Sequence, residues 1–245
     1  MHFCIPSFLP KIFVPLVFLL TAFAFPIASC ASCPVPGIRA NGEYFKSEAV
    51  FVGTVVSIRK KPDTDRDIGG WFYQLQIERI FRGQAQDKLQ VYQVYTEDSD
   101  IRFPLEKSRK YLLFAYRRRG RLEIDSCGNS ALLSDAADSL GRLEKLARAE
   151  SPTEIEGWVV AETSGIDVSG VRVSIRGRSK VYSATTDKEG WFQFQVPPGS
   201  YKTDFTSGGY YLNGGDEFWY DPEHFLVHEG ECASLQFVSV RHRLK

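Results

Sequence analysis

The sequence predicts an all-β protein, with a small closed barrel and a helix in its first part and a β-sandwich in its second. Three observations favour this class. Apolar side chains alternate with polar ones in short runs far more often than they recur at the spacing of a helix. Turn residues separate these runs at short intervals. Aromatic residues make up 13% of the chain, whereas methionine occurs once, at the start.

Residues 1–29 are expected to form a signal peptide. Lys11 is the only charged residue, apart from His2, before an apolar run from 12 to 27 that Pro15 and Pro26 interrupt. Such a run suits the apolar region of a signal peptide, while a membrane span needs roughly 20 apolar residues. No later segment is apolar enough to span a membrane. We therefore expect an exported protein.

Two cleavage sites compete at the end of this leader. Ser29-Cys30-Ala31 offers an ordinary signal peptidase the small residues it prefers, which would make Ser32 the first mature residue. Ile27-Ala-Ser-Cys30 instead resembles the bacterial lipobox, which implies an acylated Cys30 at the mature terminus. Each buried methylene of an acyl chain contributes ~0.8 kcal/mol, so such an anchor would hold the protein on a membrane. Otherwise Cys30 leaves with the leader or joins a disulfide.

Charge and cysteine count narrow the classes of function. The chain carries 30 basic and 30 acidic side chains, so no overall field attracts nucleic acid, and we expect no nucleic-acid partner. Cys30, Cys33, Cys127 and Cys232 follow the leader, and an exported protein meets oxidants that form disulfides. Four cysteines allow three pairings, between which sequence alone does not choose.

Five strands are expected in the first domain, residues 30–150. Gly53 marks a bulge or a sharp bend in the first strand. In the second, apolar residues from Trp71 to Phe81 alternate with Gln74, Gln76 and Glu78, so one face is buried and the other is wet. The expected ranges are 49–58, 71–81, 89–95, 111–116 and 121–125. Five strands of this length suit a small closed barrel.

A helix is expected after the fifth strand, with Ser134 as its cap. Acidic residues near its start and basic residues near its end complement the helix dipole: Asp135, Asp138, Arg142, Lys145 and Arg148. An apolar stripe predicts that the helix packs on the barrel; it consists of Ala136, Leu140, Leu143 and Ala147.

Dispersed motifs of the first domain resemble the netrin-like module, the OB-type barrel of tissue inhibitors of metalloproteinases. The motifs are Cys33-Pro, Ala49-Val-Phe-Val-Gly-Thr-Val, Ile80-Phe-Arg-Gly83, Tyr111-Leu-Leu-Phe-Ala and Ser126-Cys-Gly-Asn-Ser130. The resemblance implies a disulfide between Cys33 and Cys127. It also implies that Cys30, if its α-amine were free, would chelate the zinc of a protease. Acylation removes that amine, so the anchor and the inhibitor role exclude each other.

The second domain, residues 151–245, begins after Ser151-Pro152-Thr153. Val171, Val173 and Ile175 alternate with polar residues, as do Phe192, Phe194 and Val196, and a last strand is expected over 233–240. Turns are expected at 186–190, where Asp187 can cap its own turn, and at 197–200. Short strands separated by such turns indicate a sandwich.

Four motifs of this domain resemble the carboxypeptidase regulatory-like domain, a transthyretin-like sandwich. They are Gly157-Trp-Val-Val, Gly170-Val-Arg-Val-Ser-Ile, Thr186-Asp187 with Gly190-Trp-Phe192, and Pro198-Gly199-Ser-Tyr201. The resemblance implies a non-catalytic folding or docking module that accompanies other proteins.

One Gly-rich loop concentrates aromatic residues that could stack on sugar rings or contact a protein partner: Tyr210, Tyr211, Phe218, Trp219 and Tyr220. Alternatively, these rings plug the open end of the sandwich. Two basic clusters, Arg59-Lys-Lys61 and Arg117-Arg-Arg-Gly-Arg121, suit an anionic surface or are solvated turns.

Catalytic, metal and cofactor sites are not expected. His224 and His228 share a strand face, but two ligands without a third make a weak metal site. Motifs of the common hydrolases and nucleotide-binding enzymes are missing from the sequence. We therefore predict a non-catalytic, exported binding or scaffold protein of the bacterial cell envelope, lipid-anchored or secreted, with an unknown protein or glycan partner. The alternatives are a metalloprotease inhibitor and a glycan-binding surface protein.

Overall fold

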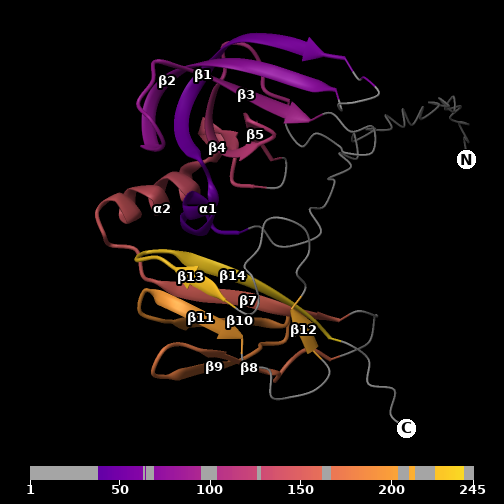
Figure 1. Ribbon diagram of the computed structural model, residues 1–245, viewed down its shortest axis with the longest axis vertical. Helices are drawn as coiled ribbons and strands as arrows, with labels where there is room; N and C mark the ends of the chain where they lie inside the picture. Colours follow the sequence, from indigo (N-terminus) through magenta and orange to yellow (C-terminus); the bar gives the residue numbers. More distant parts are fainter. Residues whose placement is uncertain are drawn as a thin grey trace, which may run out of the picture. The chain divides into compact units, whose positions relative to one another are not determined.

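The computed structural model describes residues 38–62, 64, 69–94, 104–125, 128–161, 167–203, 210–212 and 224–239, with the backbone alone for 210–212 and 236–239. Its strands form a closed barrel, drawn in indigo to magenta in Figure 1, and two further sheets that end in yellow. Among the helices of these residues, none has the length and apolar character that a membrane crossing requires.

The barrel consists of β1 (Ala49–Lys61), β2 (Gly70–Arg82), β3 (Lys88–Val94), β4 (Lys110–Arg118) and β5 (Arg121–Ile124). The strand order is β1-β2-β3-β5-β4, and a further β1–β4 pairing closes the sheet. All these pairs are antiparallel except β3–β5. The five expected strands are thus confirmed.

Strand β1 serves two neighbours because it bends. Its first part, Ala49–Thr54, pairs with β4, while its whole length pairs with β2 through three register shifts. One shift falls between Val52 and Gly53, as the sequence predicted. Bulges of this kind let a strand turn a barrel corner. Phe51 and Val55 of β1 point into the barrel core, whereas Val50 and Val52 face outward to the helices.

Helix α2 (Ala137–Ala147) follows the short strand β6 (Ala131–Leu132) and a 3₁₀ turn, Leu133–Asp135. The predicted helix is confirmed, but the predicted cap is wrong. Ala136 occupies the N-cap without a side-chain hydrogen bond, and Ser134 Oγ donates to Asp135 Oδ1 within the turn. Leu143 packs against the barrel, but Ala147 is exposed because the helix ends there.

Helix α1 (Ala40–Lys46) was not predicted. It is seven residues long and contains Asn41 and Gly42, both poor helix formers. Packing explains it, since the residues from Ala40 to Glu43 are buried and Ala40 joins the cluster on the outer face of β1 and β4.

The C-terminal strands form two four-stranded sheets, in the orders β10-β7-β14-β12 and β13-β11-β8-β9. The strands are β7 (Glu154–Ala161), β8 (Arg172–Arg176), β9 (Val181–Thr185), β10 (Trp191–Gln195), β11 (Gly199–Thr203), β12 (Tyr210–Leu212), β13 (Phe225–Val227) and β14 (Cys232–Ser239). Both sheets contribute to one apolar core, as in the predicted sandwich. The expected last strand is confirmed as β14, which runs parallel to β7. Asp187 Oδ1 accepts hydrogen bonds from the backbone of Glu189 and Trp191, so the predicted turn cap is also confirmed.

Candidate functional site

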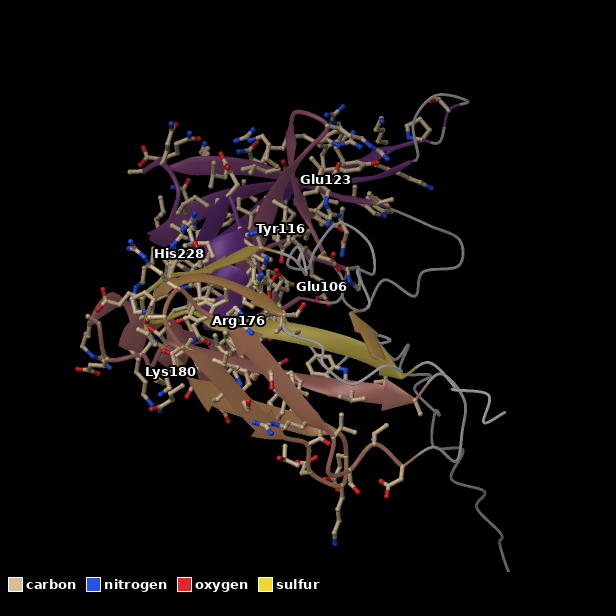
Figure 2. The ribbon with its side chains drawn as sticks, turned by 60° about the horizontal axis from the view of Figure 1, so that its bottom comes forward. Glu106, Tyr116, Glu123, Arg176, Lys180 and His228 are labelled. Atoms are coloured by element: carbon tan, nitrogen blue, oxygen red, sulfur yellow. The ribbon has the colours of Figure 1, made fainter. Side chains whose placement is uncertain are left out.

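A cavity of about 600 Å³ lies on the sheet that contains β8 and β11. It forms where the β8–β9 turn meets the start of β11 and the residue before β13. Arg176 and Lys180 of this turn are labelled in Figure 2. Its lining residues are Arg176, Gly177, Arg178, Ser179, Lys180, Tyr182, Pro197, Pro198, Gly199, Ser200, Tyr201, Lys202 and His224. We call it the hairpin pocket.

Strand pairing brings these distant segments together. Gly177 N donates to Lys180 O and closes the turn between β8 and β9. Lys202 pairs with Arg176, and Tyr201 pairs with Phe225, which places His224 at the same pocket. The walls of the hairpin pocket therefore come from three stretches of chain.

The hairpin pocket is strongly cationic. Four Lys and Arg side chains and His224 line it, and none of its described lining residues is acidic. Arg178, Lys180 and Lys202 are exposed and form no ion pair with any residue that the structure describes. Cations gathered in a concave surface raise the local concentration of anions. The arrangement suits an anionic ligand.

Tyr182 and Tyr201, with Pro197 and Pro198, form the apolar part of the hairpin pocket. Lys180 Nζ lies 5.0 Å from the centre of the Tyr182 ring, and Tyr182 meets Tyr201 edge to face at 5.9 Å. Tyr201 is buried, and its hydroxyl donates a hydrogen bond to Pro197 O. Burial raises the pKa of Tyr201 to about 12, so this hydroxyl stays neutral at physiological pH.

A second polar cluster joins α1 to the sheet of β7 and β14; we call it the α1 junction. Arg39 is the N-cap residue of α1. Its Nε lies 2.7 Å from Glu156 Oε2, and its Nη1 lies 3.6 Å from Glu154 Oε2. Asn41 Nδ2 donates to Gly230 O at 3.0 Å. The Phe45 and His228 rings stack at 4.7 Å. Gly42 is required here because a Cβ atom would collide with Cys232 O.

Cys232 belongs to this junction and is a free, fully buried thiol. It lies close to the Glu156 carboxylate. Burial, with the nearby negative charge of Glu156, raises the pKa of the thiol far above its ordinary value. A thiol held protonated in this way is a poor nucleophile, so its role here is packing.

Glu43 of α1 is a third polar centre, and it is 1% exposed. Its carboxylate accepts hydrogen bonds from Tyr116 Oη at 2.5 Å, and from Asn129 N and Nδ2 at 2.6 Å. Burial raises the pKa of Glu43, although these hydrogen bonds oppose the shift. Because it is sealed from solvent, this carboxyl fixes the chain around Asn129 rather than meeting a ligand. Tyr116 is labelled in Figure 2.

Most of the predicted site residues lie outside the described residues: Cys30, Cys33, Cys127, Phe218, Trp219 and Tyr220. For Tyr210 and Tyr211 the backbone alone is described, in β12. Lipidation of Cys30, the Cys33–Cys127 disulfide and the aromatic binding loop therefore stay predictions.

The two histidines have different neighbours, since His224 lines the hairpin pocket while His228 stacks on Phe45. The described part of the chain brings together no group of three side chains able to hold a metal ion. One member of each basic cluster lies over the same ring: Lys61 Nζ and Arg121 Cζ lie 5.8 and 3.8 Å from the centre of the Tyr92 ring. Arg121 also pairs with the buried Glu123 at 2.7 Å.

Sequence reasoning missed the hairpin pocket and the α1 junction. A signal for the first existed in Arg176-Gly-Arg-Ser-Lys180, a cationic turn between two strands. No local signal pointed to the second, because α1 itself was not expected.

Residues 154–219, about a quarter of the chain, match the family model of the carboxypeptidase regulatory-like domain, which confirms that resemblance for this segment. No curated protein matches the chain. Solved structures that it resembles include the Bacillus anthracis TIE protein, with 13% identity, a TM-score of 0.26, and coverage of 79% of this chain and 31% of that one. The chain thus spans about a third of the length of that protein.

Another is GBS52, the minor pilin of Streptococcus agalactiae, with 10% identity and a TM-score of 0.25 over 81% of this chain and 86% of that one. TM-scores of this size support no argument about the fold or the function of this chain.

Proposed function

We propose that the chain is a non-catalytic binding and scaffold protein of the bacterial cell envelope, exported by its leader and anchored through an acylated Cys30. The α1 junction is the observation that carries the scaffold role. The titratable side chains with raised pKa values at α1 and its junction support a non-catalytic role, because Glu43, Glu156 and Cys232 are 1%, 1% and 0% exposed. None of them reaches a substrate in solvent.

Helix α1 connects an anchor to both sheet systems. Cys30 stands eight positions before Ile38 in the sequence, and α1 follows at once. Through Glu43 the helix binds Tyr116 of β4, and through Arg39 it binds Glu156 of β7. A tether at Cys30 would therefore pull on an element that is fixed to the barrel and to the sandwich together. Such a tether would hold both sheet systems at the membrane.

Cell fractionation of the full chain with its own leader tests the proposal. We expect the wild type in the membrane fraction, with an intact mass that includes a diacylglycerol and an acyl chain on Cys30. Cys30→Ser should release the protein into the soluble exported fraction. Ser32→Ala is the matched control, since it leaves the lipobox unchanged and should stay with the membranes.

Two results would overturn the proposal. A mature chain that begins at Ser32 would remove the anchor, and a protein retained in the cytosol would remove export. A mature chain with an unmodified Cys30 at its terminus would instead favour the metalloprotease inhibitor, because the free amine would be present.

A further inference from the structure

We propose that the hairpin pocket binds the acidic groups of an anionic saccharide. This inference rests on the proposed function, since an exported binding protein of the envelope meets charged polysaccharides. It adds the site and the chemical class of the ligand.

The first argument for an anionic ligand is the charge of the hairpin pocket. Arg178 and Lys180 of the β8–β9 turn and Lys202 of β11 line one cavity that holds no described carboxylate. Elsewhere in the described chain, some exposed cations pair with acidic side chains, as in Arg117–Glu48 and Lys110–Glu78. Like charges without partners repel one another, so an anion that enters the hairpin pocket relieves this repulsion.

The second argument is the size and shape of the hairpin pocket, which suit a ligand larger than a single anion. A volume of about 600 Å³ falls within the range of small-molecule sites and is far larger than a lone phosphate or sulfate needs. The surface is concave, whereas a flat membrane of anionic headgroups would be met by a projecting basic face. One or two sugar units fill such a cavity while their acidic groups reach cations on different walls.

The third argument is that the hairpin pocket contains hydroxyl groups, which favour a saccharide. Ser179 of the β8–β9 turn and Ser200 of β11 are exposed and line the cavity beside the cations. Sugars present both hydroxyls and acidic groups, whereas an acidic peptide presents carboxylates on flexible stems. The Tyr182 ring holds Lys180 above it, and neutral Tyr201 forms a fixed floor. A cation held against a ring loses less side-chain freedom when it binds an anion.

Binding of defined polymers to the purified full chain tests the inference. The probes are polygalacturonate, dextran sulfate, neutral dextran and polyglutamate, each measured by calorimetry at low and at moderate salt. We expect polygalacturonate or dextran sulfate to bind, and neutral dextran and polyglutamate to bind far more weakly. The first two probes distinguish a carboxylate from a sulfate as the preferred acid.

A pocket variant and a matched control locate the site. The triple variant Arg178→Ala, Lys180→Ala, Lys202→Ala should lose about tenfold or more in affinity, as removal of three exposed charge contacts predicts. The control triple variant Arg172→Ala, Lys188→Ala, Lys145→Ala removes the same charge from exposed positions outside the hairpin pocket. It should keep the wild-type affinity within about twofold. Equal melting temperatures would show that both variants are folded.

Each unfavourable result has a definite meaning. Equal losses in the two triple variants would mean a general charge effect and would overturn the site. Polyglutamate bound as tightly as the acidic polysaccharides would overturn the saccharide. If no polymer binds while the protein still fractionates with membranes, this inference fails and the proposed function stands. If the polymers bind but export or anchoring fails, the proposed function fails and the assignment of the hairpin pocket stands.

Discussion

Arg39 Nε lies 2.7 Å from Glu156 Oε2, and this contact joins the start of α1 to the middle of β7. Glu156 Oε2 accepts no hydrogen bond with acceptable geometry, so its contact with Arg39 is electrostatic. Glu156 is 1% exposed; its burial raises its pKa, and the charge of Arg39 opposes that shift. Arg39 thus favours the charged form of Glu156 in the fold.

Replacing Arg39 should therefore destabilise the protein more than replacing a surface arginine. Arg39→Met leaves Glu156 buried without its partner and should cost about 2–3 kcal/mol of unfolding free energy. This is below the roughly 3–5 kcal/mol typical of a fully buried pair, because Arg39 is 27% exposed. Arg117→Met, which breaks an exposed pair with Glu48, should cost about 0–1 kcal/mol. Urea unfolding measures both, and equal losses would contradict the assignment.

Glu43 and Glu78 should shape the pH dependence of stability with opposite signs. Burial raises the pKa of Glu43 in the fold, so its contribution to stability is present below about pH 4.5 and is lost as pH rises through the folded value. Hydrogen bonds from Lys110 and Thr54 lower the pKa of Glu78, so its contribution is lost as pH falls. Glu43→Gln should reduce the loss of stability as pH rises. Glu78→Gln should reduce the loss of stability as pH falls.

Unfolding free energies across pH 3 to 8 check this pair of variants. Glu43→Gln should also lower stability at every pH by about 1–3 kcal/mol, because an amide cannot accept all the hydrogen bonds of the carboxylate. A pH slope that Glu43→Gln leaves unchanged would show that Glu43 does not titrate in the fold.

Cys232 should resist alkylation in the folded protein. It is fully buried and its thiol is held protonated, whereas alkylation requires the exposed thiolate. We expect iodoacetamide to modify Cys232 in urea and to leave it unmodified in buffer, as peptide mass mapping would measure. Rapid modification under native conditions would mean that β14 opens readily.

Gly157 should tolerate no side chain. A Cβ atom there would collide with Leu235 O of the neighbouring strand and with the Phe192 ring. Gly157→Ala should cost about 2–3 kcal/mol through overpacking, as thermal unfolding would show. Gly170→Ala is the control: its φ is +70° but no atom stands within 4 Å, so only the backbone cost of about 1 kcal/mol applies. A larger loss at Gly170 than at Gly157 would contradict the crowding argument.

The strands of the barrel could be predicted from the sequence because alternation is a local signal. Tyr73 and Leu75 point into the core while Gln74 and Gln76 point outward, and the run of residues alone shows this. The strands β9, β11, β12 and β13 were not singled out. β12 and β13 are three residues long, which is too short to show a period, and β9 (VYSAT) and β11 (GSYKT) lack the regular apolar–polar alternation of β8 and β10. Only part of the sandwich was thus visible in advance.

The cap of α2 shows how local rules can fail. Ser134 is a favourable cap residue, but the chain forms a 3₁₀ turn over Leu133–Asp135 before the helix starts. Ala136 is 2% exposed, and packing against the barrel sets the start of the helix there. Burial outweighed the hydrogen bond that Ser134 offered.

By itself, the sequence determined the all-β class, the closed barrel followed by a helix, the sandwich and its Asp187 turn, because periodicity and turn chemistry involve neighbouring residues. Only the tertiary structure decided that α1 forms, that Arg39 meets Glu156, that Cys232 is sealed, and that Lys202 and His224 join the Arg176–Lys180 turn in one cationic pocket. These features depend on contacts between residues far apart in the chain. Their energies come from burial and charge pairing, which a local pattern does not record.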